Sequence, residues 1–391
     1  MASEFRIAGL FAGIAGIEQG FTQALGTQAE TVLLCESWEP AQRVLRARLP
    51  DVPLHPDVRT LRDLPDRVDV LAAGFPCTDL SQAGRTAGII GPQSGLITHL
   101  FEMLDHANRR RHEISWLLIE NVSNMLMLDK GRAMAYLVSE LDNLGFRWAY
   151  RVVDSRSVGV PQRRRRVVLA ASPKEDPRGV LFADDSGGLD EAKLREDAFG
   201  FYWTEGRGGL GWARDAVPTL KGGSTVGIPS PPAVWMPDSE IGRKFVTPSI
   251  EDAEALQGFR RGWTEPADGK GRNGPRWKLV GNAVTVGVAA WAAARMANPG
   301  DFCATHSLWS QETAWPNAAW GENGKVWSVD VSEFPRLDPY RHLLETVTIR
   351  DTRPLSHRAA AGFWRRLQEG NLGQYPGFRR DIAEHVRATA P

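Results

Sequence analysis

The chain has 391 residues, of which 42% are hydrophobic and 24% charged, a composition that excludes a wholly disordered or fibrous protein. Its 47 basic and 47 acidic residues balance, so a nucleic-acid partner would require the positive charge to be concentrated on one face. The spacing of the three cysteines fits neither a zinc site nor a disulfide framework, and we expect a cytoplasmic protein without a metal. The sequence has neither a signal-peptide pattern nor a long uninterrupted apolar run, so we expect no membrane span.

The first part of the chain alternates between predicted strands and helices. Short apolar runs predict strands at 5–11, 31–35, 68–73, 116–119 and 167–171. Helical periodicity predicts helices at 17–25 and 40–49. Continuous apolar strands separated by helices predict an α/β fold: a doubly wound, mostly parallel sheet that helices cover on both faces.

The character of the sequence changes at about Ser172. Glycine, proline and aspartate are frequent over 172–247, where helical periodicity is poor, and we expect a small, loop-rich domain there. Helical patterns return at 249–256 and 283–297. We therefore expect a first domain at 1–171, the small domain at 172–247, a hinge and a returning helix at 248–299, and an extension of unknown role at 300–391. In that extension Ser356 can cap a helix that includes Phe363 and Leu367.

A glycine-rich turn joins the first predicted strand to the first helix. The segment Gly9–Gly16 would let a ligand approach the backbone, and the following helix N-terminus favours a negative group. Glu36 ends the second strand, 20 residues after Gly16, where an acidic side chain can bind ribose hydroxyls. By itself this pattern leaves open a dinucleotide site, another nucleoside cofactor, or a turn that serves only packing.

The segment Gly74–Cys77, with the sequence Gly-Phe-Pro-Cys, follows the third predicted strand. A cysteine at the carboxyl end of a parallel strand lies on the ligand-binding edge of such a sheet. Most lone cysteines are inert core residues. The polar residues that follow Cys77 do not suit a core, and we interpret Cys77 as a nucleophile. The glycine-rich segment 78–95 is expected to act as a lid.

Six blocks in order resemble the DNA cytosine-5 methyltransferase family, whose bacterial and phage members include restriction-modification enzymes. The match extends over roughly residues 5–295 and comprises Phe11–Gly16, Gly74–Cys77, Glu120–Val122, Gln162–Arg166, Leu256–Phe259 and Gly281–Val284. The resemblance implies a Rossmann-like, S-adenosylmethionine-dependent fold, with 1–171 as the catalytic and cofactor-binding domain and 172–247 as a target-recognition domain.

The resemblance also implies a catalytic mechanism. Cys77 would attack carbon 6 of a cytosine extruded from the duplex, which activates carbon 5 for methylation. A protonated Glu120 would donate to ring nitrogen 3 as charge develops on the base. Arg164 and Arg166 match the two arginines of the family's Gln-x-Arg-x-Arg block, and we assign Arg164 to cytosine oxygen 2. Arg163 and Arg165 alternate with them along a strand and are expected to face the other way.

The same resemblance assigns residues to the cofactor and to DNA. S-adenosylmethionine, which leaves as S-adenosylhomocysteine, would be bound by Phe11, Ala12, Gly13, Ile14, Gly16, Glu36, Trp38, Asp57, Val58, Pro76, Leu96, Asn282 and Val284. Glu36 would take the ribose, and Asp57 and Val58 the adenine. Contacts with DNA are expected from Ser81, Arg85, Arg163, Arg165, Thr219 and Leu220.

The sequence departs from the family pattern outside the catalytic blocks. Gly9 stands where the family usually has Asp, and Glu251 and Ala255 stand where it often has Arg. Two other functions keep much of the resemblance: a tRNA cytosine-5 methyltransferase, and a non-catalytic DNA-binding regulator. The presence of Cys77 and Glu120 disfavours the regulator, and a Ser-Asn-Met segment after Val122 disfavours the tRNA enzyme. We expect a monomer that acts on double-stranded DNA at the nucleoid, with a separately acting restriction endonuclease as a candidate partner.

Overall fold

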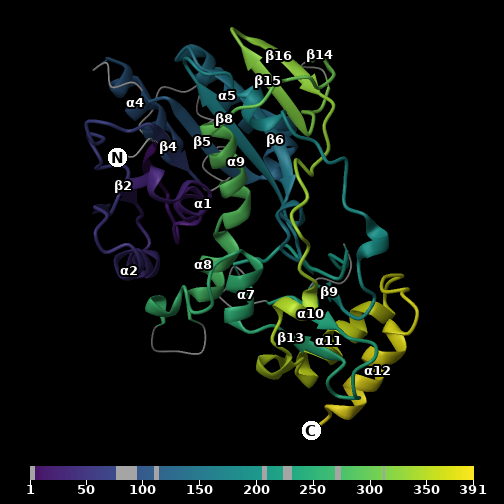
Figure 1. The fold of residues 1–391 in the computed structure, drawn as a ribbon. Coiled ribbons are helices and arrows are strands. Elements are labelled where there is room, and N and C mark those ends of the chain that lie inside the picture. The colour runs from purple at the N-terminus through teal and green to yellow at the C-terminus, as the bar shows by residue number, and fades with distance from the viewer. Residues whose placement is uncertain are drawn as a thin grey trace. The chain divides into compact units, whose positions relative to one another are not determined.

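The structure, a computed structural model, describes residues 5–75, 95–109, 114–204, 209–222, 231–268, 274–310 and 313–391. The chain forms two compact units (Figure 1). Unit 1 comprises Met1–Ser157, Arg165–Gly188 and Val284–Leu337, and unit 2 comprises Val158–Arg164, Leu189–Ala283 and Asp338–Pro391. Each unit therefore takes segments from distant parts of the sequence, and the division falls within the Gln162–Arg166 block.

The described part of unit 1 is built on one ten-stranded sheet in the order β14-β16-β15-β6-β8-β5-β4-β1-β2-β3. These strands are β1 Phe5–Leu10, β2 Ala29–Cys35, β3 Leu54–His55, β4 Val70–Ala73, β5 Trp116–Val122, β6 Arg147–Asp154, β8 Arg165–Ser172, β14 His306–Leu308, β15 Ala318–Glu322 and β16 Lys325–Val329. The half from β3 to β5 is parallel. This half carries four of the five predicted apolar strands, as β1, β2, β4 and β5, and the predicted α/β fold.

The other half of the sheet is antiparallel. β8 pairs antiparallel with both β5 and β6, although its apolar run predicted a strand of the parallel sheet. The connection from β6 to β8 has no crossover helix of the length that parallel strands need, so the chain returns antiparallel. β15 pairs with β6, and the 300–337 part of the C-terminal extension thereby enlarges the sheet.

Helices cover both faces of this sheet. Unit 1 has α1 Gly16–Leu25, α2 Glu39–Arg48, α4 Leu96–Arg109, α5 Arg132–Asn143, the short α6 Arg178–Leu181 and α9 Val286–Ala297. α4 and α5 share one apolar core with strands β1, β4 and β5. α1 and α9 run side by side (Figure 1), because Gly20 lets the backbones approach: a Cβ there would lie 2.4 Å from the Cβ of Ala289.

Unit 2 contains a five-stranded antiparallel sheet in the order β10-β9-β12-β13-β17 and a short parallel pair, β7 with β11. The strands are β7 Gln162–Arg163, β9 Phe199–Phe201, β10 Ala213–Arg214, β11 Val217–Pro218, β12 Ala233–Trp235, β13 Phe245–Thr247 and β17 Arg353–Pro354. The helices are α7 Ile250–Leu256, α8 Arg276–Asn282, α10 Leu343–Thr346, α11 His357–Gln368 and α12 Phe378–Ala388. Residues from 338 onward thus complete the fold of this unit.

Aromatic side chains form much of the core of unit 2. Phe201 of β9 contacts Phe363 of α11 and Phe378 of α12 at ring-centroid distances of 5.2 Å each. The predicted cap is present: the Ser356 side chain accepts a hydrogen bond from the backbone N–H of Ala359. Phe363 and Leu367 then face the core, as the helical pattern predicted. This packing gives the 338–391 segment a structural role.

One apolar stretch among the described residues, Arg276–Ala297, matches a membrane-spanning helix by length and by its mean hydropathy of 1.3. Within it 72% of the apolar window is buried in the protein, and the extended backbone at Ala283 and Thr285 separates α8 from α9. Burial accounts for its apolar composition.

Candidate active site

Glu120 lies at the carboxyl end of β5, within the Glu120–Val122 block. Its side chain is 11% exposed, and one carboxylate oxygen lies 3.1 Å from Nε of Arg166 on the neighbouring strand β8. The antiparallel register places Val122 opposite Arg166, so the two charged side chains come from adjacent strands at the same edge. A carboxyl group and a guanidinium group are therefore held side by side.

Asn121 fixes the backbone that leads toward the predicted nucleophile. Its buried amide nitrogen donates a hydrogen bond of 3.1 Å to the carbonyl oxygen of Phe75, and its amide oxygen accepts from the N–H of Val122 at 2.8 Å. Asn121 thus ties the end of β5 to the residue that precedes Pro76 and Cys77. Four predicted site residues lie outside the described part of the chain: Pro76, Cys77, Ser81 and Arg85.

The expected contact of Arg164 with cytosine oxygen 2 needs correction. Arg164 is 1% exposed, and its guanidinium donates to the backbone carbonyls of Leu220 and Gly281 at 3.2 Å and of Ala283 at 2.7 Å. These three bonds belong to unit 2, whereas the arginine beside Glu120 is Arg166. The geometry gives Arg164 a structural role and leaves Arg166 as the candidate for the base.

The other two arginines of the block are exposed, as the strand alternation predicted. Arg163 presents its backbone carbonyl to the hydroxyl of Thr219, which donates a 3.0 Å hydrogen bond. Arg165 forms an ion pair with Glu333 of the C-terminal extension. Because the Arg165 side chain is half-exposed, its other N–H groups stay accessible despite the ion pair. Contact of Arg163 and Arg165 with DNA remains a prediction.

Gln162 connects the family blocks of unit 2. Its buried amide nitrogen donates to the carbonyl of Leu256 and to the side chain of Gln257, and its amide oxygen accepts from the N–H of Leu220. Gln257 in turn donates to the carbonyls of Val280 and Ala283. Three of the six sequence blocks, together with Leu220, are therefore joined by buried hydrogen bonds, which explains the amide side chains at positions 162 and 257.

A cavity of about 210 Å³ lies where β1 and β2 end, lined by Phe11, Cys35, Glu36, Ser37, Asp57, Val58, Arg59 and Leu96. Five of these residues are among those assigned to the cofactor: Phe11, Glu36, Asp57, Val58 and Leu96. The sequence did not point to Cys35, Ser37 or Arg59. Cys35 and Ser37 lie at the end of a strand and Arg59 on the surface, and none of them belongs to a distinctive motif. Carboxylates that can accept from hydroxyl and amine groups suit a nucleoside.

Glu36 holds the glycine-rich turn in place. One carboxylate oxygen accepts from the N–H of Gly13 at 2.9 Å, and the other accepts from the N–H of Trp38 at 2.7 Å. Burial raises the pKa of Glu36, while these backbone hydrogen bonds oppose the shift. Phe11 and Ala15 adopt positive φ values of 54° and 66°, which give the turn its tight shape.

Asp57 is oriented by Arg59, whose guanidinium donates to both carboxylate oxygens at 2.6–3.0 Å. The hydrogen bond with Arg59 holds the pKa of the Asp57 carboxyl below its usual value. Val284 lies against the start of α1, because a Cβ on Gly16 would be 2.6 Å from the Val284 carbonyl oxygen. The remaining assigned residues lie on the turn (Ala12, Ile14), at the start of α2 (Trp38) and at the end of α8 (Asn282).

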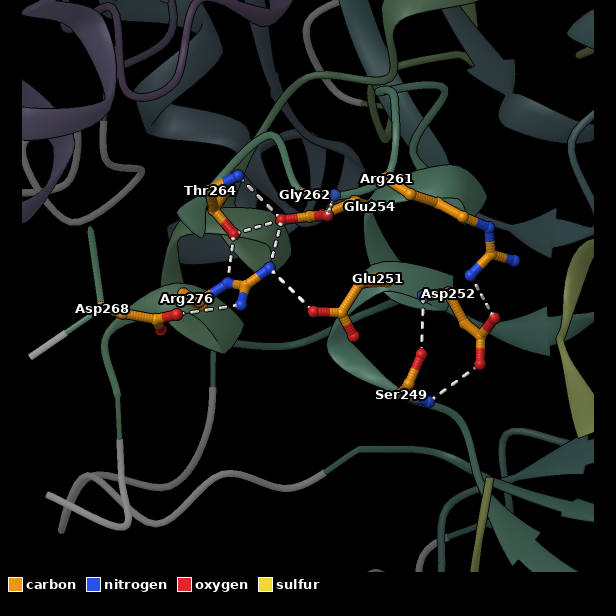
Figure 2. Close-up of polar contacts among 9 residues, drawn as sticks. All are labelled: Ser249, Glu251, Asp252, Glu254, Arg261, Gly262, Thr264, Asp268 and Arg276. Carbon is orange, nitrogen blue, oxygen red and sulfur yellow. Dashed lines mark hydrogen bonds and ion pairs between the residues drawn. The ribbon is translucent and has the colours of Figure 1, made fainter. Parts of the chain in front are cut away.

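A buried charge network connects α7 and α8 in unit 2 (Figure 2). Arg276 is 3.0 Å from Glu254 and 3.2 Å from both Glu251 and Asp268. Glu254 also accepts from the N–H groups of Gly262 and Thr264. The family often has Arg where this chain has Glu251. In this chain Arg276 of α8 supplies a cation beside α7, so Glu251 has an oppositely charged partner.

An open sheet with helices on both faces and a cavity at the carboxyl ends of its parallel strands defines a Rossmann-like fold with a candidate cofactor site. Residues 5–186 match the family model of the C-5 cytosine-specific DNA methylases. The Type II methyltransferase M2.BsuMI of Bacillus subtilis (strain 168) is 44% identical over 369 residues, 92% of each chain. The chain belongs to the C-5 cytosine-specific DNA methylase family, and its enzyme class is DNA (cytosine-5-)-methyltransferase.

More distant relatives match part of the chain or its fold. The Type II methyltransferase M.SsoII of Shigella sonnei is 32% identical over 177 residues, 44% of each chain. The crystal structure of the S. pombe Dnmt2 methyltransferase has 15% identity and a TM-score of 0.54, and the match covers 75% of this chain and 99% of that chain. At this identity the last match supports the fold alone. The family description names DNA, so the tRNA alternative has less support.

Proposed function

We propose that the protein methylates carbon 5 of a specific cytosine in double-stranded DNA through a transient bond between Cys77 and carbon 6. The observation that carries the proposal is the pairing of Glu120 with Arg166, beside a strand end that Asn121 ties to Phe75. A target cytosine must leave the duplex to reach such a pocket, at a cost of a few kcal/mol.

In the proposed reaction Cys77 adds to the cytosine ring and leaves it again, and Glu120 gives a proton to the ring and takes it back. The Cys77 thiolate adds to carbon 6, and Glu120 donates a proton to nitrogen 3 as electron density moves into the ring. Carbon 5 then takes the methyl group. Solvent takes the proton from carbon 5, and the electron pair of that C–H bond forms the carbon 5–carbon 6 double bond as the Cys77 thiolate leaves carbon 6. Nitrogen 3 returns its proton to Glu120, and the ring regains its aromaticity. Arg166, in place of Arg164, holds oxygen 2 and orients Glu120.

S-adenosylmethionine supplies the methyl group as an activated sulfonium when it is bound. Glu36 and Asp57 of the cavity suit the ribose hydroxyls and the adenine amine, and Phe11 supplies an apolar surface. The start of α1 suits the methionine carboxylate, because helix N-termini favour anions. Asn282 and Val284 complete the assignment by family resemblance.

DNA recognition is assigned to unit 2, where Thr219 and Leu220 form the element nearest to a family motif. Leu220 is 1% exposed, and its backbone N–H and carbonyl bond to Gln162 and Arg164, so Thr219 is the proposed contact of this pair. Arg163 and Arg165 are proposed as phosphate contacts, since guanidinium groups on exposed strand positions suit backbone binding. The 44% identical Type II relative supports the proposal of a restriction-modification setting, with an endonuclease that acts separately on the same sequence.

The test is methylation of a random-sequence DNA duplex with bisulfite readout, which reports activity and target sequence together. Cys77→Ser should abolish turnover and leave S-adenosylmethionine binding unchanged. Cys303→Ser is the matched control, because Cys303 is an exposed thiol in the extension and should be dispensable. Full activity of the Cys77→Ser enzyme would refute the covalent mechanism.

A further inference from the structure

The Thr219–Gly222 segment of unit 2 is held in place by buried hydrogen bonds. The amide oxygen of Gln162 accepts from the backbone N–H of Leu220 at 2.9 Å, and the Arg164 guanidinium donates to the Leu220 carbonyl at 3.2 Å. Both of these side chains are buried. The segment also rests on α8, since a Cβ on Gly281 would lie 2.5 Å from the last backbone N of the segment. Side chains on this segment and beside it therefore have a fixed backbone beneath them.

Three exposed basic residues adjoin this segment from three parts of unit 2. Lys221 belongs to the segment itself. Arg163 of β7 lies beside it, because the backbone carbonyl of Arg163 accepts a 3.0 Å hydrogen bond from the hydroxyl of Thr219. Lys278 of α8 lies at its end, since a Cβ on Gly222 would be 3.1 Å from Cγ of Lys278. We call Arg163, Lys221 and Lys278 the basic patch, and all three are exposed.

The two lysines of the basic patch present their charge at the surface. Nζ of Lys221 lies 4.1 Å from the centroid of the Tyr202 ring, and Tyr202 is buried. A cation is attracted to an aromatic face at this distance, so the ring positions the ammonium group without neutralising it. Lys278 follows two positions after the buried Arg276 on α8, and residues two apart lie on different sides of a helix. Lys278 is therefore on another side of α8 from the charge network around Arg276.

We propose that the basic patch binds the phosphate backbone of DNA beside the bases that unit 2 reads. The inference rests on the proposed function, which assigns DNA recognition to unit 2 and a DNA contact to Thr219. Lysine binds phosphate as a compact point charge, and cations that are already positioned lose less side-chain entropy on binding. The chain has no net charge, so binding to DNA needs such a local concentration of cations. Lys221 and Lys278 thereby join Arg163 as residues that set the register of unit 2 on the duplex.

The test is the salt dependence of equilibrium binding of the full chain to the random-sequence duplex. Each phosphate contact contributes about 0.9 to the slope of the logarithm of the binding constant against the logarithm of the salt concentration. Lys221→Met, Lys278→Met and Arg163→Met should each lower the slope by about this amount and leave the target preference in the bisulfite assay unchanged. Methionine keeps much of the aliphatic stem, so the melting temperatures should match that of the wild type. Lys221→Arg, which keeps the charge, should retain the wild-type slope.

Lys193→Met is the matched control in the same unit, because the Lys193 side chain is 82% exposed and lies 3.7 Å from Asp190. It should leave the slope unchanged, and an equal decrease in this variant would overturn the patch in favour of an effect of net charge. A patch variant that alters the preference at one base pair would overturn the phosphate assignment of that residue.

The inference and the proposed function fail in different ways. Unchanged slopes in all three patch variants of a chain that methylates the duplex would overturn the basic patch alone. A wild-type chain that leaves the duplex unmethylated, although the patch variants lower its slope as expected, would overturn the proposed function alone.

Discussion

Replacement of Arg276 by Met should destabilise unit 2 more than a typical arginine substitution. The guanidinium lies 3.0 Å from Glu254, whose side chain is fully buried, and donates to the hydroxyl of Thr264 at 2.8 Å. Burial alone would lower the pKa of Arg276, but its hydrogen bond and charge interactions with Glu254 raise it above the ordinary value. Met keeps most of the side-chain volume and removes the charge.

The magnitude follows from the exposure of the partners. Glu251 and Asp268 have side chains that are 38% and 60% exposed, and each such pair contributes at most about 1 kcal/mol. Removal of one partner from a buried pair costs about 3–5 kcal/mol, because the other charge stays buried. We therefore expect Arg276→Met to lower the free energy of unfolding of unit 2 by about 4 kcal/mol.

Urea unfolding of the full chain, followed by circular dichroism and tryptophan fluorescence, measures this loss. Arg350→Ala is the matched control: its side chain is 87% exposed, its nearest carboxylate oxygen is 3.7 Å away, and the substitution should change stability little. Arg276→Met combined with Glu254→Gln should cost less than the sum of the two single substitutions. A loss below about 1 kcal/mol in Arg276→Met, the range of a surface pair, would refute the view that Glu254 depends on Arg276.

Two further predictions concern unit 1 and the arginine block. Burial raises the pKa of Glu18 to about 7, so its carboxyl group opposes folding progressively as pH rises from about 4.5 to 7. Glu18→Gln should therefore be as stable as the wild type near pH 4 and more stable by about 3 kcal/mol above pH 7. Parallel curves of unfolding free energy against pH for the two proteins would contradict this. Arg166→Ala should keep the wild-type melting temperature and lose about 100-fold in kcat, whereas Arg164→Ala should lower the stability of unit 2 by about 2–4 kcal/mol. Activity assays and thermal melts of both variants separate the two roles, and the opposite pattern would return Arg164 to the base.

Local sequence pattern predicted strands β1, β2, β4 and β5 of the parallel half, and the glycine-rich turn with Glu36 at its edge, whereas Phe11 and Asp57 were assigned from the family resemblance. Phe11, Glu36 and Asp57 follow successive strands, and the carboxyl ends of parallel strands meet at one edge. Arg59 was missed because its role comes from its hydrogen bonds with Asp57, a contact that no spacing rule signals. The antiparallel strands β14–β16 were also missed, since short, partly exposed strands lack the continuous apolar run of a buried one.

The choice between Arg164 and Arg166 shows a different limit. Strand alternation predicted that these two side chains share a face and that Arg163 and Arg165 share the other, and exposure agrees. The structure breaks the strand at Arg164: β7 ends at Arg163 in unit 2, and β8 begins at Arg165 in unit 1. Two arginines on one predicted face therefore enter different surroundings. The position of the break depends on the strands that pair with β7 and with β8. The sequence of the Gln162–Arg166 block does not contain those strands.

The departures from the family pattern at Gly9 and at Glu251 have a common physical explanation. A Cβ on Gly9 would lie 1.9 Å from a carboxylate oxygen of Glu18, so an Asp at position 9 and the buried Glu18 would compete for one place. In this chain α1 supplies the acidic group beside Gly9, at Glu18, and α8 supplies the cation beside Glu254, at Arg276. In both cases an element other than the one that departs from the family pattern carries the charged group. Gly9→Asp should therefore be tolerated only together with a smaller, uncharged residue at position 18.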